Sequence, residues 1–235
     1  SLTKMIIPPS VKSIGNNSFE DCKNLKNISI PESVISIGNN AFENCQSLTK
    51  MIIPPSATSI GDYFVLGCFE LKKITIPNIQ KIGKLCFQDY KKITEFIITS
   101  TVTRIYENAF KNCSSLKKIE IPSSITIIEQ YAFEGCTSLK EITIPPSVIA
   151  IQKCTFAYCF SLSKVNLPST LLSIGTQVFM QCTSLVYITI PSSVKKIGFD
   201  LFDGCESLKK IIFNSDLKEI KIIDKIPDCL KIVVV

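Results

Sequence analysis

The sequence repeats a unit of 23 residues over most of its length, and this repeat limits the possible folds more than any other feature. The unit reads LxxIxIPxSVxxIGxxAFxxC and is complete in residues 25–45. Ten copies span residues 2–220, opening at Leu2, Leu25, Leu48, Leu71, Ile93, Leu116, Leu139, Leu162, Leu185 and Leu208. A unit this short cannot bury its apolar side chains alone, so stacked units must share one continuous core. We therefore predict a single solenoid domain over residues 1–235.

Each part of the unit predicts a local structure. LxxIxI is typical of a short strand whose first, fourth and sixth side chains turn inward. Proline follows this strand in eight copies and ends it, because proline has no N–H to donate to a sheet. SVxxI predicts a second short strand, and the glycine after it a corner where positive φ is allowed. AFxxC predicts one helical turn with Phe and Cys inward.

The repeat departs from its consensus mainly within residues 60–100. Val65 stands in the phenylalanine column, Tyr90 in the cysteine column and Thr99 in the proline column, and one residue is missing shortly after Ile76. We expect the least regular coils here. A local distortion is the main interpretation, and a dedicated binding notch is the alternative.

The two ends of the stack raise separate expectations. The last regular coil ends near residue 220, and residues 221–235 form either a partial further coil or a cap. Open coil ends expose apolar surface and strand edges, so an oligomer formed through the coil ends is one expected partnership. The chain does not begin with Met, which is consistent with removal of a signal or an upstream domain.

Two absences in the composition exclude most catalytic chemistry. The 235 residues include no His and no Trp, and Arg104 is the single Arg among 26 basic residues. Without His there is no Ser-His-Asp triad, no Cys-His dyad and no HExxH or mixed Cys/His zinc site. We therefore predict a protein that is not an enzyme, with no catalytic residue, no metal and no cofactor. The scarcity of Arg disfavours specific nucleic-acid recognition, and no apolar run of about 18 residues predicts a transmembrane segment.

Eleven cysteines suggest disulfides or a metal, but their positions favour buried thiols. Eight share one column of the repeat: Cys22, Cys45, Cys68, Cys113, Cys136, Cys159, Cys182 and Cys205. Stacked side chains point the same way, which keeps their Cβ atoms near the strand spacing of about 4.8 Å, whereas disulfides prefer about 3.8 Å. Buried reduced thiols are the main prediction, with disulfides or metal binding as alternatives. Cys86 is expected to be buried, and Cys154 and Cys229 are candidates for exposed thiols.

The strand phrase LxxIxIP and its continuation SVxxIGxxAFxxC resemble the BspA-like, or treponemal-type, leucine-rich repeat proteins, and the resemblance covers nearly the whole chain. It implies an α/β solenoid: a curved, right-handed horseshoe of about ten 23-residue coils with a parallel sheet on one face. Proteins of this class are typically surface or secreted proteins used in adhesion and protein–protein contact. The class has no catalytic motif to carry over.

The second, third and fifth positions of LxxIxI are expected to face solvent on the sheet side. Eleven of these thirty positions are Lys and three are Glu, giving this face a net charge of +8 and the rest of the chain −2. The lysines are Lys4, Lys26, Lys50, Lys72, Lys73, Lys117, Lys118, Lys140, Lys164, Lys209 and Lys210. Such a face attracts an acidic protein, a sulfated glycan or an anionic membrane surface. The alternative is that Lys is simply the chain's common exposed residue and protects the sheet from edge pairing.

Tyr187, with Val186 beside it, is the best candidate for a contact anchor, because aromatic side chains are enriched in interface hot spots. The predicted partner-binding residues are Lys26, Lys50, Lys72, Lys73, Lys117, Lys118, Lys140, Lys164, Tyr187, Lys209 and Lys210. Two functions remain open. The first is a cell-surface or secreted adhesin that binds a protein or acidic glycan. The second is an intracellular scaffold or regulatory subunit, which reduced cysteines favour and which would place the protein in the cytoplasm.

Overall fold

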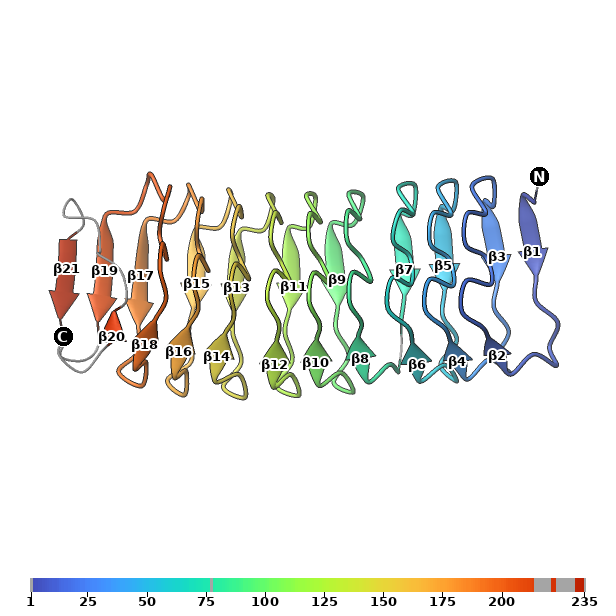
Figure 1. The fold of residues 1–235 in the computed structure, drawn as a ribbon, viewed down its shortest axis with the longest axis horizontal. Coiled ribbons are helices and arrows are strands. Elements are labelled where there is room, and N and C mark those ends of the chain that lie inside the picture. The colour runs from blue at the N-terminus through green and yellow to red at the C-terminus, as the bar shows by residue number, and fades with distance from the viewer. Residues whose placement is uncertain (1, 77, 214–220, 223–230, 235) are drawn as a thin grey trace.

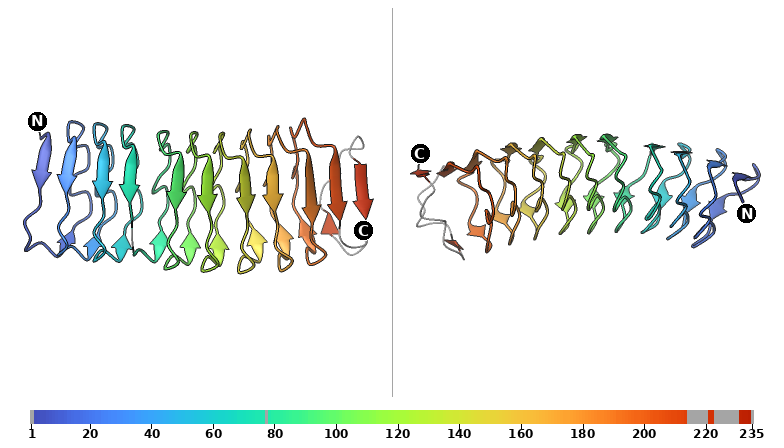
Figure 2. Two further views of the ribbon diagram at one scale, coloured as in Figure 1. Left: turned by 180° about the vertical axis from the view of Figure 1, so that it is seen from behind. Right: turned by 90° about the horizontal axis from the view of Figure 1, so that it is seen from above.

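The computed structural model describes residues 2–76, 78–213, 221–222 and 231–234. The predicted solenoid is confirmed. Within these residues the chain completes nine coils and begins a tenth, and each complete coil carries one longer and one shorter strand. The coils stack into an extended body whose two ends carry the N-terminal and C-terminal strands (Figure 1). Figure 2 shows that the stack bends only gently along its length.

The longer strands come from the LxxIxI phrase and form one side of the stack. They are β1 (Lys4–Ile6), β3 (Asn27–Ser29), β5 (Lys50–Ile52), β7 (Lys73–Thr75), β9 (Glu95–Ile97), β11 (Lys118–Glu120), β13 (Glu141–Thr143), β15 (Lys164–Asn166), β17 (Tyr187–Ile190), β19 (Lys210–Phe213) and β21 (Lys231–Val234). Neighbouring strands that pair are parallel and one repeat apart, as Met5 opposite Ile28 shows.

The shorter strands confirm the second strand predicted from SVxxI. They are β2 (Ser13–Ile14), β4 (Ser36–Ile37), β6 (Ser59–Ile60), β8 (Lys81–Ile82), β10 (Arg104–Ile105), β12 (Ile127–Ile128), β14 (Ala150–Ile151), β16 (Ser173–Ile174), β18 (Lys196–Ile197) and β20 (Lys221–Ile222). They also pair in parallel with the equivalent strand of a neighbouring coil.

The core lies inside the coils and repeats as columns of identical side chains. Leu48 and Phe42 are fully buried, as the inward positions of the repeat predict. The rings of Phe110, Phe133 and Phe156 stack nearly parallel, with centroids 5.3 and 5.5 Å apart. Each coil therefore covers the apolar face of its neighbour, which no coil could bury by itself.

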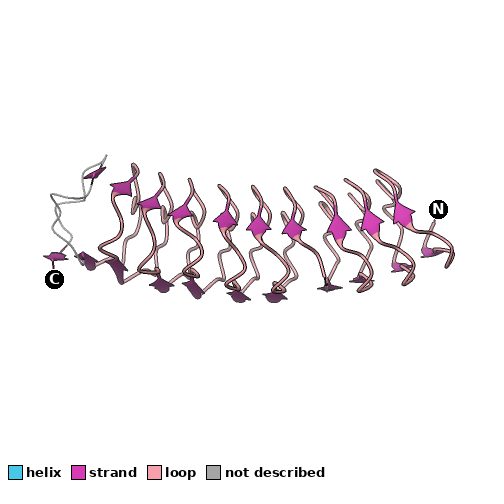
Figure 3. Ribbon diagram, turned by 90° about the horizontal axis from the view of Figure 1, so that it is seen from below, coloured by secondary structure: helices cyan, strands magenta, loops and turns pink. Residues whose placement is uncertain are grey.

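The helical turn predicted for AFxxC is not found, because no helix occurs in the described residues and Figure 3 shows only strands and loops there. Asn40, just before this segment, and Asn44, within it, have φ of 55° and 57°, which interrupts a right-handed helix. Phe42 donates its N–H to the Phe64 carbonyl of the next coil at 3.1 Å, and Cys45 donates to the Phe42 carbonyl at 3.3 Å. Successive turns bonded to the next coil therefore replace the helical turn.

The glycine at each corner is required by close packing between coils. A Cβ on Gly38 would lie 2.4 Å from Oδ1 of Asn16 and 2.6 Å from its backbone nitrogen. Asn16 comes this close because its Oδ1 accepts the N–H of Asn39 at 2.8 Å. The expectation of positive φ at this glycine is wrong, since positive φ falls two residues later, at Asn17 and Asn40.

The sheet of longer strands is interrupted at three places in the described residues: between β7 and β9, between β11 and β13, and between β15 and β17. The first interruption lies within residues 60–100, where the sequence predicts the least regular coils. Figure 1 shows β7 and β9 spaced more widely than the strands on either side of them.

Two large buried side chains account for the wide spacing between β7 and β9. Tyr90 replaces the usual cysteine, and Phe96 stands where most coils have isoleucine. The Phe96 ring lies 4.9 Å from Phe87 and 5.0 Å from Phe110. Two enlarged side chains in the same part of the core push the coils apart, since packed interiors have no spare volume. This supports a local distortion as the meaning of the irregular coils.

The ten cysteines among the described residues are all free, and nine are buried. Seven column thiols donate to the phenylalanine carbonyl of the preceding coil, as Cys136 does to Phe110 at 3.3 Å and Cys159 to Phe133 at 3.3 Å. Burial raises the pKa of the Cys136 thiol well above its usual value, so it keeps the proton that it donates. The main prediction for this column, buried reduced thiols, agrees with the structure.

The prediction that Cys154 is exposed is wrong. Its side chain is only 5% exposed. Its backbone N–H donates to the Thr176 carbonyl at 3.0 Å, and its thiol lies 3.5 Å from Oε1 of Gln177, so the next coil covers it. Cys86 is buried as expected, and Cys229 lies outside the described residues.

Candidate functional site

The outward positions of the longer strands form a lysine-bearing surface, here called the sheet face. All of the predicted binding lysines with described side chains reach solvent there: Lys26, Lys50, Lys72, Lys117, Lys118, Lys140, Lys164 and Lys209 are exposed, and Lys210 is half-buried. Lys73 lies on β7, but its side chain lies outside the described set. The prediction that these positions turn outward is therefore confirmed for the side chains described.

The middle of the sheet face neutralises part of its own charge. Nζ of Lys118 lies 2.9 Å from Oε1 of Glu120, and Nζ of Lys164 lies 3.8 Å from Oε2 of Glu141. The hydrogen bond to Glu120 raises the pKa of Lys118 and lowers that of the carboxyl. All four side chains are more than half exposed, so these pairs contribute little to stability, but they reduce the charge offered to a ligand.

The strands β1 to β7 carry lysine without this compensation. Their outward positions hold Lys4, Lys26, Lys50, Lys72 and Lys73 and no acidic residue. Among the described residues, no carboxylate lies within salt-bridge distance of the first four, and Glu70, which pairs with Lys92, attracts Lys72 only at longer range. These four lysines are called the N-terminal lysine group below.

The group occupies two neighbouring rows across the coils. In the third position of LxxIxI, Lys4 lies opposite Asn27, Asn27 opposite Lys50 and Lys50 opposite Lys73. Lys26 and Lys72 hold the second position, where Lys26 donates its N–H to Thr3 and Lys72 to Thr49. A shallow groove of about 280 Å³ lies between β3 and β5, where Lys50 and Ile52 form one wall. Ile52 is 52% exposed, so apolar surface lies directly beside the positive charge.

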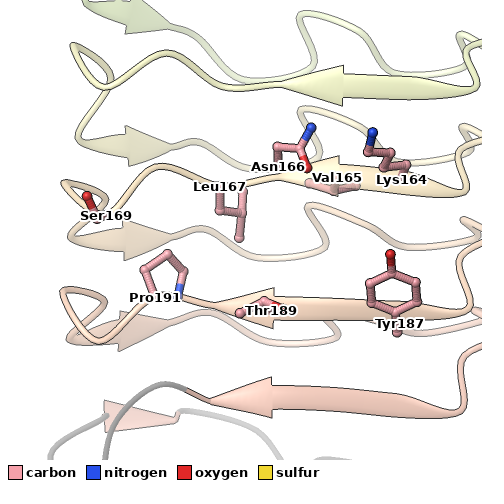
Figure 4. A pocket seen from close by; sticks show the side chains of 8 residues that line it. All are labelled: Lys164, Val165, Asn166, Leu167, Ser169, Tyr187, Thr189 and Pro191. Carbon is pink, nitrogen blue, oxygen red and sulfur yellow. The ribbon is translucent and has the colours of Figure 1, made fainter. Parts of the chain in front are cut away.

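Tyr187 lies far from the N-terminal lysine group, on β17. It is 55% exposed and pairs in register with Lys210, while Lys164 holds the equivalent position on β15. A groove of about 260 Å³ separates β15 from β17, and Tyr187 forms part of its wall (Figure 4). The structure thus divides the predicted binding residues into an N-terminal set, a partly neutralised middle and a C-terminal set around Tyr187.

Sequence reasoning missed this division for an identifiable reason. Net charge counted over thirty positions does not show which lysines have a carboxylate one coil away. The spacing of Glu141 and Lys164, exactly one repeat apart, was a usable signal for one pair. The groove beside Tyr187 had no sequence signal, because it lies between two strands, β15 and β17, whose lack of pairing is a property of the folded stack.

The described residues contain no group of three or more His, Cys, Asp or Glu placed to hold a metal ion. They also contain no helix with the length and apolar character needed to cross a bilayer.

A stack of parallel coils of about 23 residues, with leucine two residues before nearly every longer strand, defines a leucine-rich repeat protein. The family model for the BspA type leucine rich repeat region matches residues 1–117 and 103–222, with six copies, so this chain belongs to that family. Leucine-rich repeats of this kind are generally protein-interaction modules. A comparison with curated proteins finds no match.

Solved structures of bacterial proteins share the fold. A leucine-rich repeat protein from Bacteroides ovatus is 29% identical, with a TM-score of 0.78 over 98% of this chain and 70% of that one. A leucine rich cell surface protein from Faecalibacterium prausnitzii is 25% identical, with a TM-score of 0.54 over 99% of this chain and 79% of that one. A leucine-rich repeat protein from T. pallidum is 23% identical, with a TM-score of 0.52 over 78% of each chain, and shows the fold alone.

Proposed function

We propose that this protein is a non-enzymatic interaction module at the cell surface or in the secreted fraction, and that its N-terminal lysine group binds an acidic macromolecular partner. The observation that carries the proposal is the two rows of exposed lysines over β1 to β7 with no acidic residue among the outward positions. Lysine recurs at every second coil in both positions, as Lys4 and Lys50 in the third and Lys26 and Lys72 in the second. A partner with regularly spaced negative charge complements this arrangement.

Exposed apolar side chains beside the lysines favour a role in binding for this surface over a role in keeping the protein soluble. Ile6 is 65% exposed and Ile52 is 52% exposed, and both lie on the same strands as the lysines. A ligand that pairs with the ammonium groups also covers these side chains, which adds a contribution that salt does not screen. The cell surface is supported by the relative from Faecalibacterium prausnitzii, which is described as a cell surface protein.

The test is retention on immobilised heparin as a model polyanion. The triple variant K26E/K50E/K72E is expected to elute at much lower salt than the wild type, because it reverses the uncompensated charge. The matched control is K12E/K91E/K153E, which makes the same change of net charge at exposed lysines outside the longer strands. Equal loss of retention in both variants would show that only net charge matters and would reject the sheet face as the site.

A second candidate function is an intracellular scaffold or regulatory subunit. One observation favours it: the ten described cysteines form no disulfide, as expected in a reducing compartment. A thiol count on protein purified without reductant tests it. Close to eleven thiols after unfolding keeps this candidate open, whereas a count far below eleven would require disulfides and an oxidising compartment.

A further inference from the structure

Tyr187 has an unusual position on the sheet face. The second, third and fifth positions of LxxIxI in the ten repeats make thirty outward positions, and Tyr187 is the one aromatic residue among them. Lys164 and Lys210 hold the equivalent third position on the strands before and after it, β15 and β19. A flat exposed ring therefore lies between two cationic side chains in one row.

The groove beside this ring lies between two neighbouring strands that do not pair. β15 pairs with β13 and β17 pairs with β19, but β15 and β17 do not pair with each other in this described part of the chain. Figure 4 shows the Tyr187 hydroxyl directed toward β15, with Lys164 and Asn166 along that opposite strand. The groove volume of about 260 Å³ is just below the range of roughly 300–1,000 Å³ for drug-sized ligands, so it suits one ring-sized unit of a longer chain.

The groove offers a mixed set of chemical groups. Lys164 supplies a positive charge, Ser169 and Thr189 supply hydroxyls, and Asn166 supplies an amide. The amide nitrogen of Asn166 already donates to Oγ1 of Thr143 at 2.9 Å, which leaves its oxygen to accept from a ligand hydroxyl. No carboxylate lines the groove.

The groups that line the groove favour an acidic sugar over an acidic peptide. An acidic peptide that adds as a strand needs a free row of backbone N–H and C=O groups. The facing edges of β15 and β17 are unpaired, so strand addition is kept as an outcome of the test below, but the groove is lined by one lysine, one amide and two hydroxyls rather than by a series of cations. A sugar ring presents an apolar C–H face for the Tyr187 ring and hydroxyls for the Asn166 and Thr189 groups, and an acidic substituent completes the match to lysine.

We propose that the groove between β15 and β17 is a subsite for one uronate residue of an acidic glycan. Tyr187 packs against the ring, and Lys164 pairs with the carboxylate. The exposed Lys164–Glu141 pair, at 3.8 Å, is weak enough for the ammonium group to turn to a ligand. The proposal rests on the proposed function in taking the sheet face as the binding surface, but it concerns different coils.

Trigalacturonate is the probe, with neutral maltotriose beside it, and binding is followed by nuclear magnetic resonance titration. We expect trigalacturonate to bind and maltotriose to bind much more weakly. Tyr187→Ala should weaken trigalacturonate binding on the order of tenfold. The matched control is Phe199→Ala, which removes another exposed aromatic ring, 49% exposed, from outside the longer strands, and it should leave binding unchanged.

The other possible outcomes test the groove subsite and the proposed function separately. Unchanged binding in Tyr187→Ala overturns the subsite, and so does equal binding of maltotriose. If hexaglutamate competes with trigalacturonate at equal affinity, the ligand class is wrong and the groove takes acidic peptide. If trigalacturonate does not bind while heparin retention still depends on Lys26, Lys50 and Lys72, the subsite fails and the proposed function stands. Thermal melts of both variants establish that neither is unfolded.

Discussion

The thiol of Cys136 donates a hydrogen bond to the carbonyl oxygen of Phe110, one coil earlier, at 3.3 Å. The same bond recurs along the column, so a residue that a composition count would assign to disulfides or metals instead links neighbouring coils. The same carbonyl also accepts the N–H of Cys113 at 3.1 Å. The thiol thus serves as a small buried side chain with one donor.

Replacing Cys136 tests the value of this link. Cys136→Ala removes both the sulfur and the donor from a fully buried position, and we expect it to lower the free energy of unfolding by about 1–2 kcal/mol. Cys136→Ser keeps a donor facing the Phe110 carbonyl and should be more stable than the alanine variant. Urea unfolding measures both. A serine variant no more stable than the alanine variant would mean that the bond contributes nothing.

The corner glycines give a matched pair of variants. Gly38→Ala places a Cβ 2.4 Å from Oδ1 of Asn16, so the coils must separate, and we expect a loss of about 1–3 kcal/mol. Gly15 occupies the same column in the first coil, where a Cβ meets only Oγ of Ser18 at 3.4 Å. Gly15→Ala should therefore be close to neutral in thermal unfolding. Equal losses in both variants would contradict the packing explanation.

The buried hydroxyl of Tyr90 lowers the stability of the fold. Its Oη is buried and has no hydrogen-bond partner in the structure, and burial raises its pKa. Tyr90→Phe removes this unpaired hydroxyl while keeping the ring, and it should raise the free energy of unfolding by about 1 kcal/mol or more. The control is Tyr187→Phe at an exposed position, which should change stability by less than about 0.5 kcal/mol. A destabilised Tyr90→Phe would reveal a partner for the hydroxyl.

Buried thiols also predict a loss of stability at high pH. Burial raises the pKa of Cys86 from 9.0 to about 12. Between these values the unfolded thiol releases its proton while the folded thiol keeps it. The stabilising contribution is therefore complete below pH 9 and declines as pH rises toward 12.

Cys86→Ala isolates this effect, because alanine occupies the same column at Ala109 and Ala132. Between pH 8 and pH 10 the wild type should lose about 1.4 kcal/mol more stability than the variant. Urea unfolding at both pH values gives the comparison. Parallel losses in the two proteins would show that Cys86 does not titrate differently on unfolding.

Much of this architecture was predictable because the same pattern of apolar and polar residues recurs in ten copies. The inward positions of Leu48 and Phe42, the outward position of Lys50 and the burial of Cys136 all follow from period and residue type. The helical turn was not predictable in the same way. AFxxC is compatible with a helix locally, but Asn40 before it and Asn44 within it adopt positive φ, and the N–H groups of Phe42 and Asn44 bond to the next coil.

The candidate site shows the same limit. The sequence by itself determined that a lysine-rich sheet face would exist and that Tyr187 would lie on it, because alternation along a strand is a local property. Only the tertiary structure decided which lysines have a carboxylate within reach, where Tyr90 and Phe96 force coils apart, and which strands leave a groove. Those features depend on contacts between residues one coil apart, where small differences in side-chain volume and strand pairing add up along the stack.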